Sequence, residues 1–401
     1  LELAENLREL GMDVTIAQLP KQLMNPFDPD MASMIHNEMR KHGIKLVLGY
    51  TVEGFKEKDD GVEVLLKDNP SLQADMVVLA IGVTPDTVLA KEAGLELGIK
   101  ESIIVNDRME TSVPDIYAAG DAVQVKHYVT GNDALISLAG PANKQGRIIA
   151  DNICGGDSRY LGSQGSSVIK VFDMTAATTG INETNAKKSG LEVDTVILSP
   201  MSHAGYYPGG KVMTMKVVFE KETYRLLGAQ IIGYEGVDKR IDVLATAIHA
   251  GLKATQLKDL DLAYAPPYSS AKDPVNMAGF MIDNIAKGTL KQWHLEDMDR
   301  ISKDKNAVLL DVRTVGEFSR GHINGFKNIP VDELRERINE VEKGKPVYLI
   351  CQSGLRSYIA SRILEGNGYE TYNFSGGFRF YDAVVNDRAL IEKAYACGMD
   401  Y

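Results

Sequence analysis

One loop of the sequence combines a cysteine, an arginine and mostly small residues in a pattern suited to sulfur chemistry. Cys351 follows an expected strand at 347–350 and precedes an expected helix at 358–364, with Arg356 between them. Backbone N–H groups of such a loop, the positive end of the helix dipole and the guanidinium all stabilise negative charge on a sulfur atom. The pattern predicts a site for a thiolate or a persulfide, and the alternative is a buried structural cysteine beside a salt-bridging arginine. The remaining loop residues are Gln352, Ser353, Gly354 and Leu355.

Two segments between residues 111 and 153 predict a surface for an anionic or electron-rich ligand. An expected strand, Ile116–Ala118, runs into Gly120 and Asp121, where small residues allow close approach and a carboxylate is held at the tip. In the second segment an expected helix opens around Gly140, so its first N–H groups are free to face a ligand. The alternative is an ordinary turn followed by a packed helix. The first residues of the second segment are Leu138, Ala139, Gly140 and Pro141.

Two loops rich in tyrosine and proline predict an interface or a substrate wall. The first loop spans His203–Gly209 and the second spans Ala263–Pro274. Such loops are stiff and amphipathic, because proline restricts the backbone and tyrosine combines an apolar ring with a polar hydroxyl. The alternative is ordinary turn chemistry. The tyrosines concerned are Tyr206 and Tyr207 in the first loop and Tyr264 and Tyr268 in the second.

The elements expected in residues 1–86 alternate as in a doubly wound parallel sheet. A leucine stripe predicts a helix that stops at Gly11, and Asp28-Pro29 predicts the start of a second helix that ends at Gly43. Ala74–Ile81 is a continuous apolar run that ends in Gly82, as expected of a buried parallel strand. Ligand sites in such sheets lie at the carboxyl edge of the strands. The other expected strands span 12–16, 45–49, 51–56 and 62–66.

The remaining chain divides into three further blocks, at 87–160, 161–290 and 291–401. The block 161–290 predicts strands at 168–172, 194–198, 212–219 and 226–234 and a helix at 237–250. The last block is expected to be a separate small module with a strand at 308–310, approached through a linker, Lys287–Lys305. Cys154 and Cys397 lack the surroundings of Cys351 and are expected to be structural.

Composition restricts the class of protein. With 401 residues the chain predicts two to three domains, and 44 % hydrophobic and 25 % charged residues are typical of a globular protein. A net charge of −11 argues against general affinity for nucleic acid or an anionic membrane. No apolar run approaches the ~18 residues of a membrane span, and we expect neither a membrane span nor a signal peptide. Three scattered cysteines do not suit a disulfide-stapled secreted fold, so we expect a cytoplasmic protein.

The last block closely resembles the rhodanese module. The resemblance rests on the loop CQSGLRS with the segments DVRTVGEFSRGHINGFKNIP and NFSGGFRFY, and covers about 100 residues. It implies that Cys351 is a sulfur-carrying nucleophile, that Gln352–Arg356 form the active-site loop, and that Asp311 and Arg313 support it. Four residues separate Cys351 from Arg356, one fewer than in related phosphatases, which favours sulfur transfer over phosphate hydrolysis.

The first 290 residues resemble the FAD- and NAD(P)H-dependent pyridine nucleotide–disulfide oxidoreductases. TSVPDIYAAGD is similar to that family's second FAD motif, which implies that Asp121 bonds the ribityl chain, beside Gly120. LAGPANKQGR is similar to the helix start beside the flavin ring, with Leu138, Ala139 and Gly140. ADMVVLAIG is similar to the end of the nicotinamide domain and includes Gly82, and LELAENLRELGMDVTI places Glu2 near the nicotinamide.

This resemblance implies an α/β fold with four parts. They are an incomplete NAD(P)H-binding domain at 1–86, the C-terminal part of an FAD-binding domain at 87–160, an α+β dimerisation domain at 161–290 and a rhodanese domain at 291–401. The family's glycine-rich turns and redox cysteine are expected ahead of Leu1. Gln18 stands where an acidic residue would bind the ribose of NAD, so the choice between NADH and NADPH stays open.

Within this family, the YYPG and YAPPY loops together with a rhodanese module are typical of the coenzyme A disulfide reductases and their persulfide-reductase relatives. The resemblance implies FAD, NADH or NADPH, and coenzyme A, with a homodimer whose loops cross a two-fold axis. Tyr206 and Tyr264 are the expected catalytic tyrosines, with Tyr207 and Tyr268 beside the substrate. Two alternatives are a thiosulfate sulfurtransferase on a flavoprotein scaffold and an NADH oxidase or peroxidase of the same fold.

Overall fold

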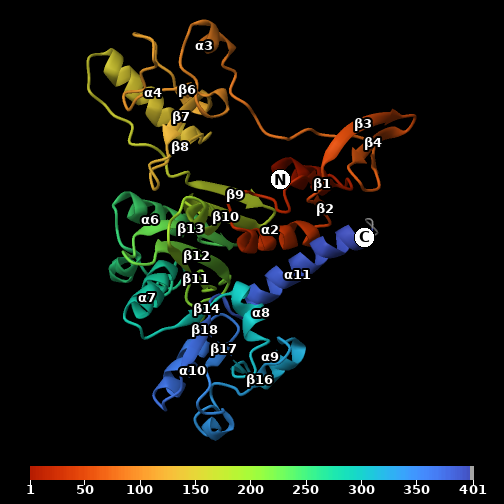
Figure 1. Cartoon of the computed structure of the whole chain (residues 1–401), viewed down its shortest axis with the longest axis vertical. Helices are drawn as coiled ribbons and strands as arrows, with labels where there is room; N and C mark the ends of the chain where they lie inside the picture. The colour runs from red at the N-terminus through yellow and green to blue at the C-terminus, as the bar shows by residue number, and fades with distance from the viewer. Residues whose placement is uncertain (398–401) are drawn as a thin grey trace.

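The computed structural model describes residues 1–397, and the side chains of residues 1–393. The side chain of Cys397 therefore lies outside the description. Four sheets of three or more strands and one two-stranded parallel sheet alternate with helices along residues 1–374, and the long helix α11 (Gly377–Cys397) follows them (Figure 1). Among residues 1–397, no helix is both long enough and apolar enough to cross a membrane.

The N-terminal part forms the expected helices and most of the expected strands. Helix α1 (Glu2–Glu9) leads to β1 (Thr15–Gln18), and α2 (Pro29–Lys41) leads to β2 (Lys45–Leu48), which pairs with β1 in parallel. Helix α2 begins with proline at its first position and buries Met31, Ile35 and Met39. A separate antiparallel sheet follows, composed of β3 (Val52–Lys58), β4 (Gly61–Leu66) and β5 (Leu72–Ala74).

The buried strand expected at Ala74–Ile81 is wrong. Only Ala74 of this run is in a strand, and the chain beyond it is extended without pairing up to residue 87. Ile81 is 91 % exposed and Leu79 is 64 % exposed. A parallel strand keeps apolar side chains on both faces only where sheet neighbours and helices cover it, and among the described residues the parallel sheet here contains β1 and β2 alone.

The extended run leads to a lobe that stands apart from α2 (Figure 1). Its small core contains Met109, Val123 and Val125, with Ile148 and Ile149 of α4 packed against them. The strand expected at Ile116–Ala118 is reduced to a single bridge between Glu110 and Tyr117. The elements of the lobe are α3 (Val88–Glu92), η1 (Ile99–Glu101), β6 (Ile103–Ile104), η2 (Gly120–Ala122), β7 (Val123–Lys126), β8 (Asp133–Ala134) and α4 (Ala139–Ile153).

A five-stranded antiparallel sheet forms the centre of the molecule, in the order β11-β12-β13-β10-β9. Four strands and one helix match expectation: β9 (Ser167–Val171), β11 (Val193–Leu198), β12 (Met213–Glu220), β13 (Leu226–Gly233) and α6 (Val237–His249). The fifth strand, β10 (Met174–Gly180), was not predicted, because its threonines and alanines do not alternate in hydrophobicity. The remaining elements are α5 (Glu183–Lys188), η3 (Ala254–Asp259) and α7 (Pro274–Ala286).

The last part is a parallel sheet in the order β14-β18-β17-β15-β16. Its strands are β14 (Gln292–Trp293), β15 (Val308–Asp311), β16 (Lys327–Asn328), β17 (Val347–Ile350) and β18 (Thr371–Phe374). Its helices are η4 (Leu295–Asp297), α8 (Met298–Ile301), α9 (Val315–Arg320), η5 (Ile338–Glu340), α10 (Leu355–Glu365) and α11. The carboxyl end of β17 therefore runs directly into the Cys351 loop and α10.

The segment expected to be a linker, Lys287–Lys305, contains strand β14 of this sheet. Strand β14 pairs with β18, and Trp293 is 1 % exposed. The Trp293 indole donates a hydrogen bond to the Leu349 carbonyl at 3.2 Å and packs on Phe374 with ring centroids 4.3 Å apart. A two-residue strand carries no periodicity in the sequence, so its position depends on tertiary packing.

The module 291–401 is not separate, because one buried core joins it to two other parts of the chain. That core combines Ile35 of α2, Ile232 of β13 and Phe374 of β18 with residues around them. Helix α11 lies along α2 (Figure 1), where the buried Asp387 carboxylate accepts hydrogen bonds from His36 Nδ1 at 2.8 Å and from Arg40. The module expected at 291–401 is therefore packed against the rest of the chain, and it is not joined to it by a linker alone.

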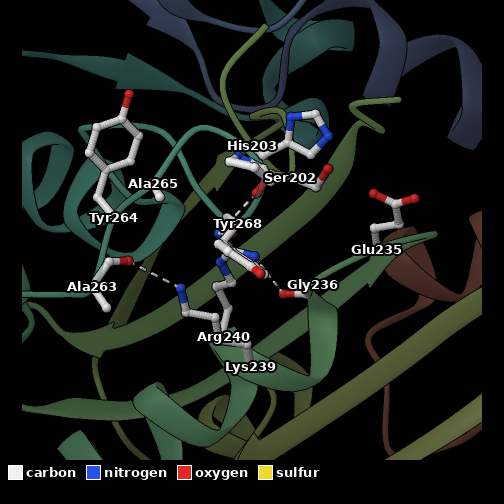
Figure 2. Close-up of a pocket in the computed structure, with 11 residues that line it drawn as sticks. Ser202, His203, Glu235, Gly236, Lys239, Arg240, Ala263, Tyr264, Ala265 and Tyr268 are labelled. Atoms are coloured by element: carbon white, nitrogen blue, oxygen red, sulfur yellow. Dashed lines mark hydrogen bonds between the residues drawn. The ribbon is translucent and has the colours of Figure 1, made fainter. Parts of the chain in front are cut away.

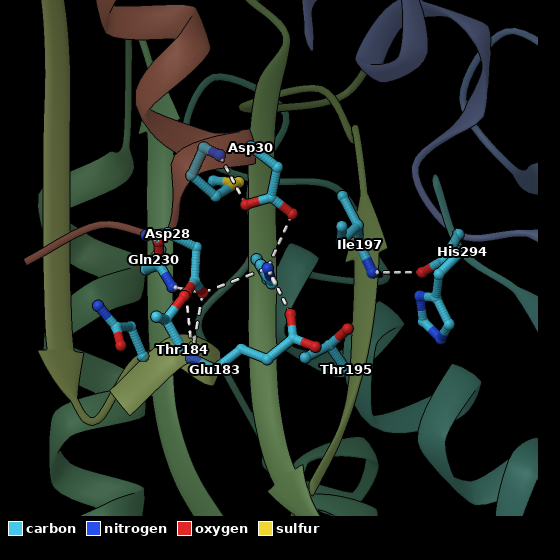
Figure 3. Close-up of polar contacts among 12 residues, drawn as sticks. Asp28, Asp30, Glu183, Thr184, Thr195, Ile197, Gln230 and His294 are labelled. Atoms are coloured by element: carbon cyan, nitrogen blue, oxygen red, sulfur yellow. Dashed lines mark hydrogen bonds and ion pairs between the residues drawn. The ribbon is translucent and has the colours of Figure 1, made fainter. Parts of the chain in front are cut away.

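A buried lysine further joins the N-terminal part to the central sheet. The Lys216 ammonium lies 3.2 Å from Asp28, 2.8 Å from Asp30 and 2.7 Å from Glu183, which surround it (Figure 3). Burial lowers the pKa of Lys216, but the three carboxylates outweigh it and raise the pKa. Asp28 precedes α2 as expected, yet its carboxylate does not cap that helix and instead accepts the backbone N–H of Thr184 at 2.9 Å.

Replacing Lys216 by methionine should destabilise the protein by about 3–5 kcal/mol, because one buried and two partly buried carboxylates lose their cation. The free energy of unfolding is measured by denaturant titration. Lys187→Met is the matched control, since Lys187 is exposed and pairs with the same Glu183, and should cost less than about 1 kcal/mol. Equal losses in the two variants would contradict the role given to Lys216.

Candidate functional site

A pocket of about 600 Å³ lies beneath the two aromatic loops, beside the start of α6. Figure 2 shows Tyr264 and Tyr268 around it, with Lys239 and Arg240 at its base. His203 of the first loop also lines it. The loops that the sequence singled out are thus neighbours in space, although about 60 residues separate them in the chain.

Arg240 holds the two loops together. Its side chain is 1 % exposed, and its Nη2 donates to the Ser202 carbonyl at 2.9 Å, directly before the first loop, and to Asp273 at 3.0 Å in the second loop. The Ala204 N–H adds a direct bond to the Ser269 carbonyl at 2.9 Å. Because Asp273 also caps α7 through the Val275 N–H, the loops are fixed to two helices. These hydrogen bonds hold the pocket wall in place, and they occupy the Arg240 guanidinium.

The structure brings Tyr206 and Tyr264 into contact. Their hydroxyl oxygens lie 2.8 Å apart, and this hydrogen bond raises the pKa of Tyr264. Tyr206 is 77 % exposed and Tyr268 is 72 % exposed. The Tyr207 ring packs edge-on against the His203 ring, with ring centroids 5.6 Å apart. The sequence left open which tyrosine of each loop acts, and the contact singles out Tyr206 and Tyr264 as the pair that can share a proton.

Cys351 sits at the end of β17 in a cradle of hydrogen-bond donors. Its sulfur accepts from the Gly354 N–H at 3.1 Å and from the Ser357 hydroxyl at 3.2 Å, and the residue is 1 % exposed. Helix α10 begins at Leu355, so its N-terminal dipole adds to the positive potential at the loop. Gly354 has a φ of +101°, which only glycine adopts without strain. The arrangement can stabilise one negative charge on sulfur.

The start of α11 supports this loop from behind. The N–H groups of Phe378 and Arg379 donate to the carbonyls of Cys351 and Gln352 at 2.7 and 3.2 Å. Gly377 makes the close approach possible, because a Cβ there would lie 2.7 Å from the Gln352 carbonyl oxygen. Helix α11 therefore fixes the Cys351 loop at one end and packs on α2 with its other face.

Asp311 and Arg313 form the expected support. The Arg313 guanidinium donates to Asp311 Oδ2 at 2.7 Å, and both residues are buried. Arg313 also stacks on the Phe378 ring at 3.8 Å and reaches the Gln352 side chain at 3.4 Å. The pair connects β15, the Cys351 loop and the start of α11.

Arg356 binds a partner that sequence reasoning missed. Its two terminal nitrogens each lie 2.7 Å from an oxygen of Glu317, in a bidentate pair. The hydrogen bonds from Arg356 lower the pKa of Glu317 to about 2, so the carboxylate is ionised at neutral pH. A capping box with Thr314 was visible in the sequence and locates Glu317 in the first turn of α9. Nothing in the sequence indicated that Arg356, 39 residues away, would bind it.

Gly120 and Asp121 lie beside α4, as the flavin-binding expectation requires. The Gly120 N–H donates to the buried Gln145 of α4 at 2.7 Å, and Gly120 has a φ of +78°. Asp121 is exposed, as are Ala139 and Gly140, and no side chain caps the helix start at Leu138. An exposed carboxylate next to an uncapped helix N-terminus fits one wall of a flavin site.

Other expected site residues lie elsewhere. Glu2 is exposed in the first turn of α1, and Gly82 lies in the extended run with a φ of +99°. Figure 1 shows α1 and α4 in different parts of the molecule, so the structure does not bring Glu2 next to Asp121. Cys154, expected to be structural, is a free and exposed thiol at the end of α4.

Three family models match successive segments of this chain. Residues 1–146 match the pyridine nucleotide-disulphide oxidoreductase model, residues 166–274 match the dimerisation domain of that family, and residues 294–383 match the rhodanese-like domain.

Two solved structures share this whole arrangement. Reduced CoADR-RHD of Bacillus anthracis is 46 % identical with a TM-score of 0.93, over 96 % of this chain and 69 % of that one. An NAD-dependent persulfide reductase from A. fulgidus is 39 % identical with a TM-score of 0.88, over 95 % of this chain and 70 % of that one.

Two curated relatives each match 69 % of this chain. A CoA-dependent NAD(P)H sulfur oxidoreductase of Pyrococcus abyssi is 36 % identical over 69 % of this chain and 61 % of its own length. An NADH oxidase of Methanocaldococcus jannaschii, 35 % identical, is covered over 62 % of its length, so the chain spans about three fifths of these relatives. With the fold and these matches together, the chain belongs to the pyridine nucleotide-disulphide oxidoreductases and carries a rhodanese-like domain.

Proposed function

We propose that this protein acts as a flavin-dependent NAD(P)H oxidoreductase that reduces coenzyme A disulfide or coenzyme A persulfides and polysulfides, with sulfane sulfur carried on Cys351. One observation carries the proposal: the oxidoreductase part and the Cys351 module share one buried core around Trp293 and Ile35. A shared core fixes the proposed redox centre relative to the Cys351 cradle. Such an arrangement is suited to two successive reactions on the same sulfur substrate. The relatives named for persulfide and CoA-dependent sulfur reduction support the same substrate class.

The lobe at 87–160 would hold FAD in this proposal. FAD, when bound, takes a hydride from NADH or NADPH and passes two electrons to a disulfide or persulfide. Asp121 would accept hydrogen bonds from the ribityl hydroxyls, and Gly120 leaves room for close approach. The free N–H groups at the start of α4 would face the electron-rich edge of the ring.

The Tyr206–Tyr264 pair would handle the proton of the thiol half-reaction. One hydroxyl donates to the other across 2.8 Å, which leaves one proton directed outward for a departing thiolate. The exposure of Tyr206 and Tyr268 leaves this face open to a second subunit. We therefore place it at a homodimer interface, in keeping with the dimerisation domain matched at 166–274.

At Cys351 the thiolate would attack the outer sulfur of a persulfide. A new S–S bond forms to Cys351, the donor's S–S bond breaks, and the donor leaves as a thiolate. The Gly354 N–H and the Ser357 hydroxyl then stabilise the terminal sulfur anion. Attack by an acceptor thiolate returns Cys351 to its starting state. Unpaired, sparse cysteines suit this chemistry in a reducing compartment such as the cytoplasm.

A thiosulfate sulfurtransferase on a flavoprotein scaffold is the second candidate. The completeness of the Cys351 cradle favours it, because none of its hydrogen bonds depends on the oxidoreductase part. Consumption of NADH with coenzyme A disulfide or a coenzyme A persulfide distinguishes the two, since the second candidate has no use for a reductant.

Asp121→Ala should lose flavin. Removing a charge-assisted hydrogen bond should cost about 1.5–3 kcal/mol of flavin-binding free energy. Flavin content is read from the absorbance of the purified flavin-containing protein. Asp151→Ala, an exposed carboxylate near the other end of α4, is the control and should retain flavin. Full flavin content in Asp121→Ala would refute the assignment.

Tyr206→Phe combined with Tyr264→Phe should slow reduction of the disulfide or persulfide roughly a hundredfold, the usual contribution of a positioned acid. Flavin reduction by NAD(P)H should stay at its normal rate, because the lost hydroxyls serve only the thiol half-reaction. Stopped-flow absorbance separates the two half-reactions. The matched control is Tyr207→Phe with Tyr268→Phe, and a larger loss there would shift the catalytic role to those residues.

Cys351→Ser should abolish sulfurtransfer while NADH-driven reduction of a small disulfide continues. After treatment with a sulfur donor, mass spectrometry should find one extra sulfur atom on the peptide that bears Cys351. Cys154→Ser, the other described free thiol, is the control and should transfer sulfur normally. A persulfide on Cys154 with Cys351 unmodified would contradict the proposal.

A further inference from the structure

The cation beside the Cys351 loop is neutralised by a fixed anion. Arg356 and Glu317 form a bidentate pair with both distances at 2.7 Å, and their side chains are 30 % and 23 % exposed. Glu317 is held in place by Thr314 as well, whose N–H and hydroxyl each donate to it at 2.9 Å. A carboxylate with four donors is preorganised, so it cancels the charge of Arg356 without needing to reorient.

The second guanidinium near the loop is neutralised in the same way. Arg313 binds Asp311 through Nε and Nη2, and its remaining contacts include the Gly321 carbonyl at 2.8 Å. The two arginines and two carboxylates therefore sum to no net charge. The donors left for the reacting sulfur are the dipoles of the Cys351 cradle: the Gly354 N–H, the Ser357 hydroxyl and the start of α10.

Sulfur donors differ in the charge that they bring to this neutral site. When the Cys351 thiolate attacks thiosulfate, an S–S bond to Cys351 forms, the S–S bond of thiosulfate breaks and sulfite dianion leaves, so the reacting group carries three negative charges throughout. When it attacks the ionised persulfide (RSS⁻) of a neutral thiol, an S–S bond to Cys351 forms, the S–S bond of the donor breaks and the donor leaves as a thiolate, so the reacting group carries two negative charges. Repulsion between like charges opposes the first reaction more than the second.

We propose that Glu317 is a specificity-determining residue that, by cancelling Arg356, tunes Cys351 toward persulfides of low charge and against thiosulfate. This inference rests on the proposed role of Cys351 as a sulfur carrier. Glu317 touches no substrate in this account and acts through Arg356 alone.

Glu317→Gln tests the inference in the full chain, because glutamine preserves the capping box with Thr314 and removes only the charge. kcat/KM is measured with thiosulfate and with the persulfide of 2-mercaptoethanol. The unaltered protein should prefer the persulfide. In the variant kcat/KM for thiosulfate should rise about tenfold and that for the persulfide about threefold, as expected for one unit charge acting on a dianion and on a monoanion.

Two further variants complete a charge series. Arg356→Gln leaves Glu317 unopposed and should lower kcat/KM for thiosulfate more than for the persulfide. The double variant has no net charge and should return the ratio of the two donors to the original value. Glu340→Gln is the matched control, because Glu340 pairs with Arg337 in the same module and should leave the ratio unchanged.

The outcomes separate the inference from the proposed function. An unchanged donor ratio in Glu317→Gln, or an equal fall with both donors, would overturn the inference and leave the sulfur-carrying role intact. If Glu317→Gln does not fold, a change in ratio of the opposite sign in Arg356→Gln still supports the inference, and an unchanged ratio there overturns it. No sulfurtransfer from either donor in the unaltered protein would overturn both.

Discussion

The buried core around Trp293 is the constraint on which the rest of the structure depends. It combines side chains of α2, of the central antiparallel sheet and of the parallel sheet that carries Cys351. Dense packing of this kind transmits strain and leaves little freedom for rigid-body movement. Helix α11 extends the same connection, since its first residues bond the Cys351 loop and Asp387 bonds His36 on α2. The position of Cys351 relative to the oxidoreductase part is therefore set by the fold. In the proposed function, a mobile substrate would have to carry sulfur between the two sites.

Buried charge pairs join the parts of the chain around the aromatic loops, the Cys351 loop and the central sheet, and in each pair the cation is already bound by carboxylates. Arg240 joins the two aromatic loops, Arg313 joins the Cys351 loop to β15, and Lys216 joins α2 to the central sheet. Such pairs contribute little net stability but make removal of one partner costly, so they specify geometry. The groups that we propose to react, Tyr206, Tyr264 and Cys351, are instead held by neutral hydrogen bonds. In the proposed reaction these groups could change charge while the buried charge pairs keep theirs.

Sequence reasoning predicted most elements whose pattern is local. Apolar runs and stop signals predicted the central strands β11, β12 and β13 and the helices α2 and α6. Residue types alone marked the loops with Cys351, Tyr206 and Tyr264 as candidate functional sites. Sequence reasoning failed where the position of an element depends on residues far away in the chain. Ala74–Ile81 has the composition of a buried strand but no strand beside it, and Trp293 lies in a strand too short to show a period. Two contacts arise only from tertiary packing. One is the ion pair between Glu317 and Arg356, and the other is the hydroxyl contact that distinguishes Tyr206 and Tyr264 from the other two tyrosines of their loops.

Native-state hydrogen exchange across α2, β13, β17 and α11 tests most directly whether the redox part and the Cys351 module are one body. Amides in one cooperative unit open together, so under rising denaturant their exchange free energies merge into a common value. The account predicts that the slowest amides of all four elements merge, because they share the core around Trp293. Merging of β17 and α11 at a lower free energy than α2 and β13 would show that the module opens independently and would contradict the account.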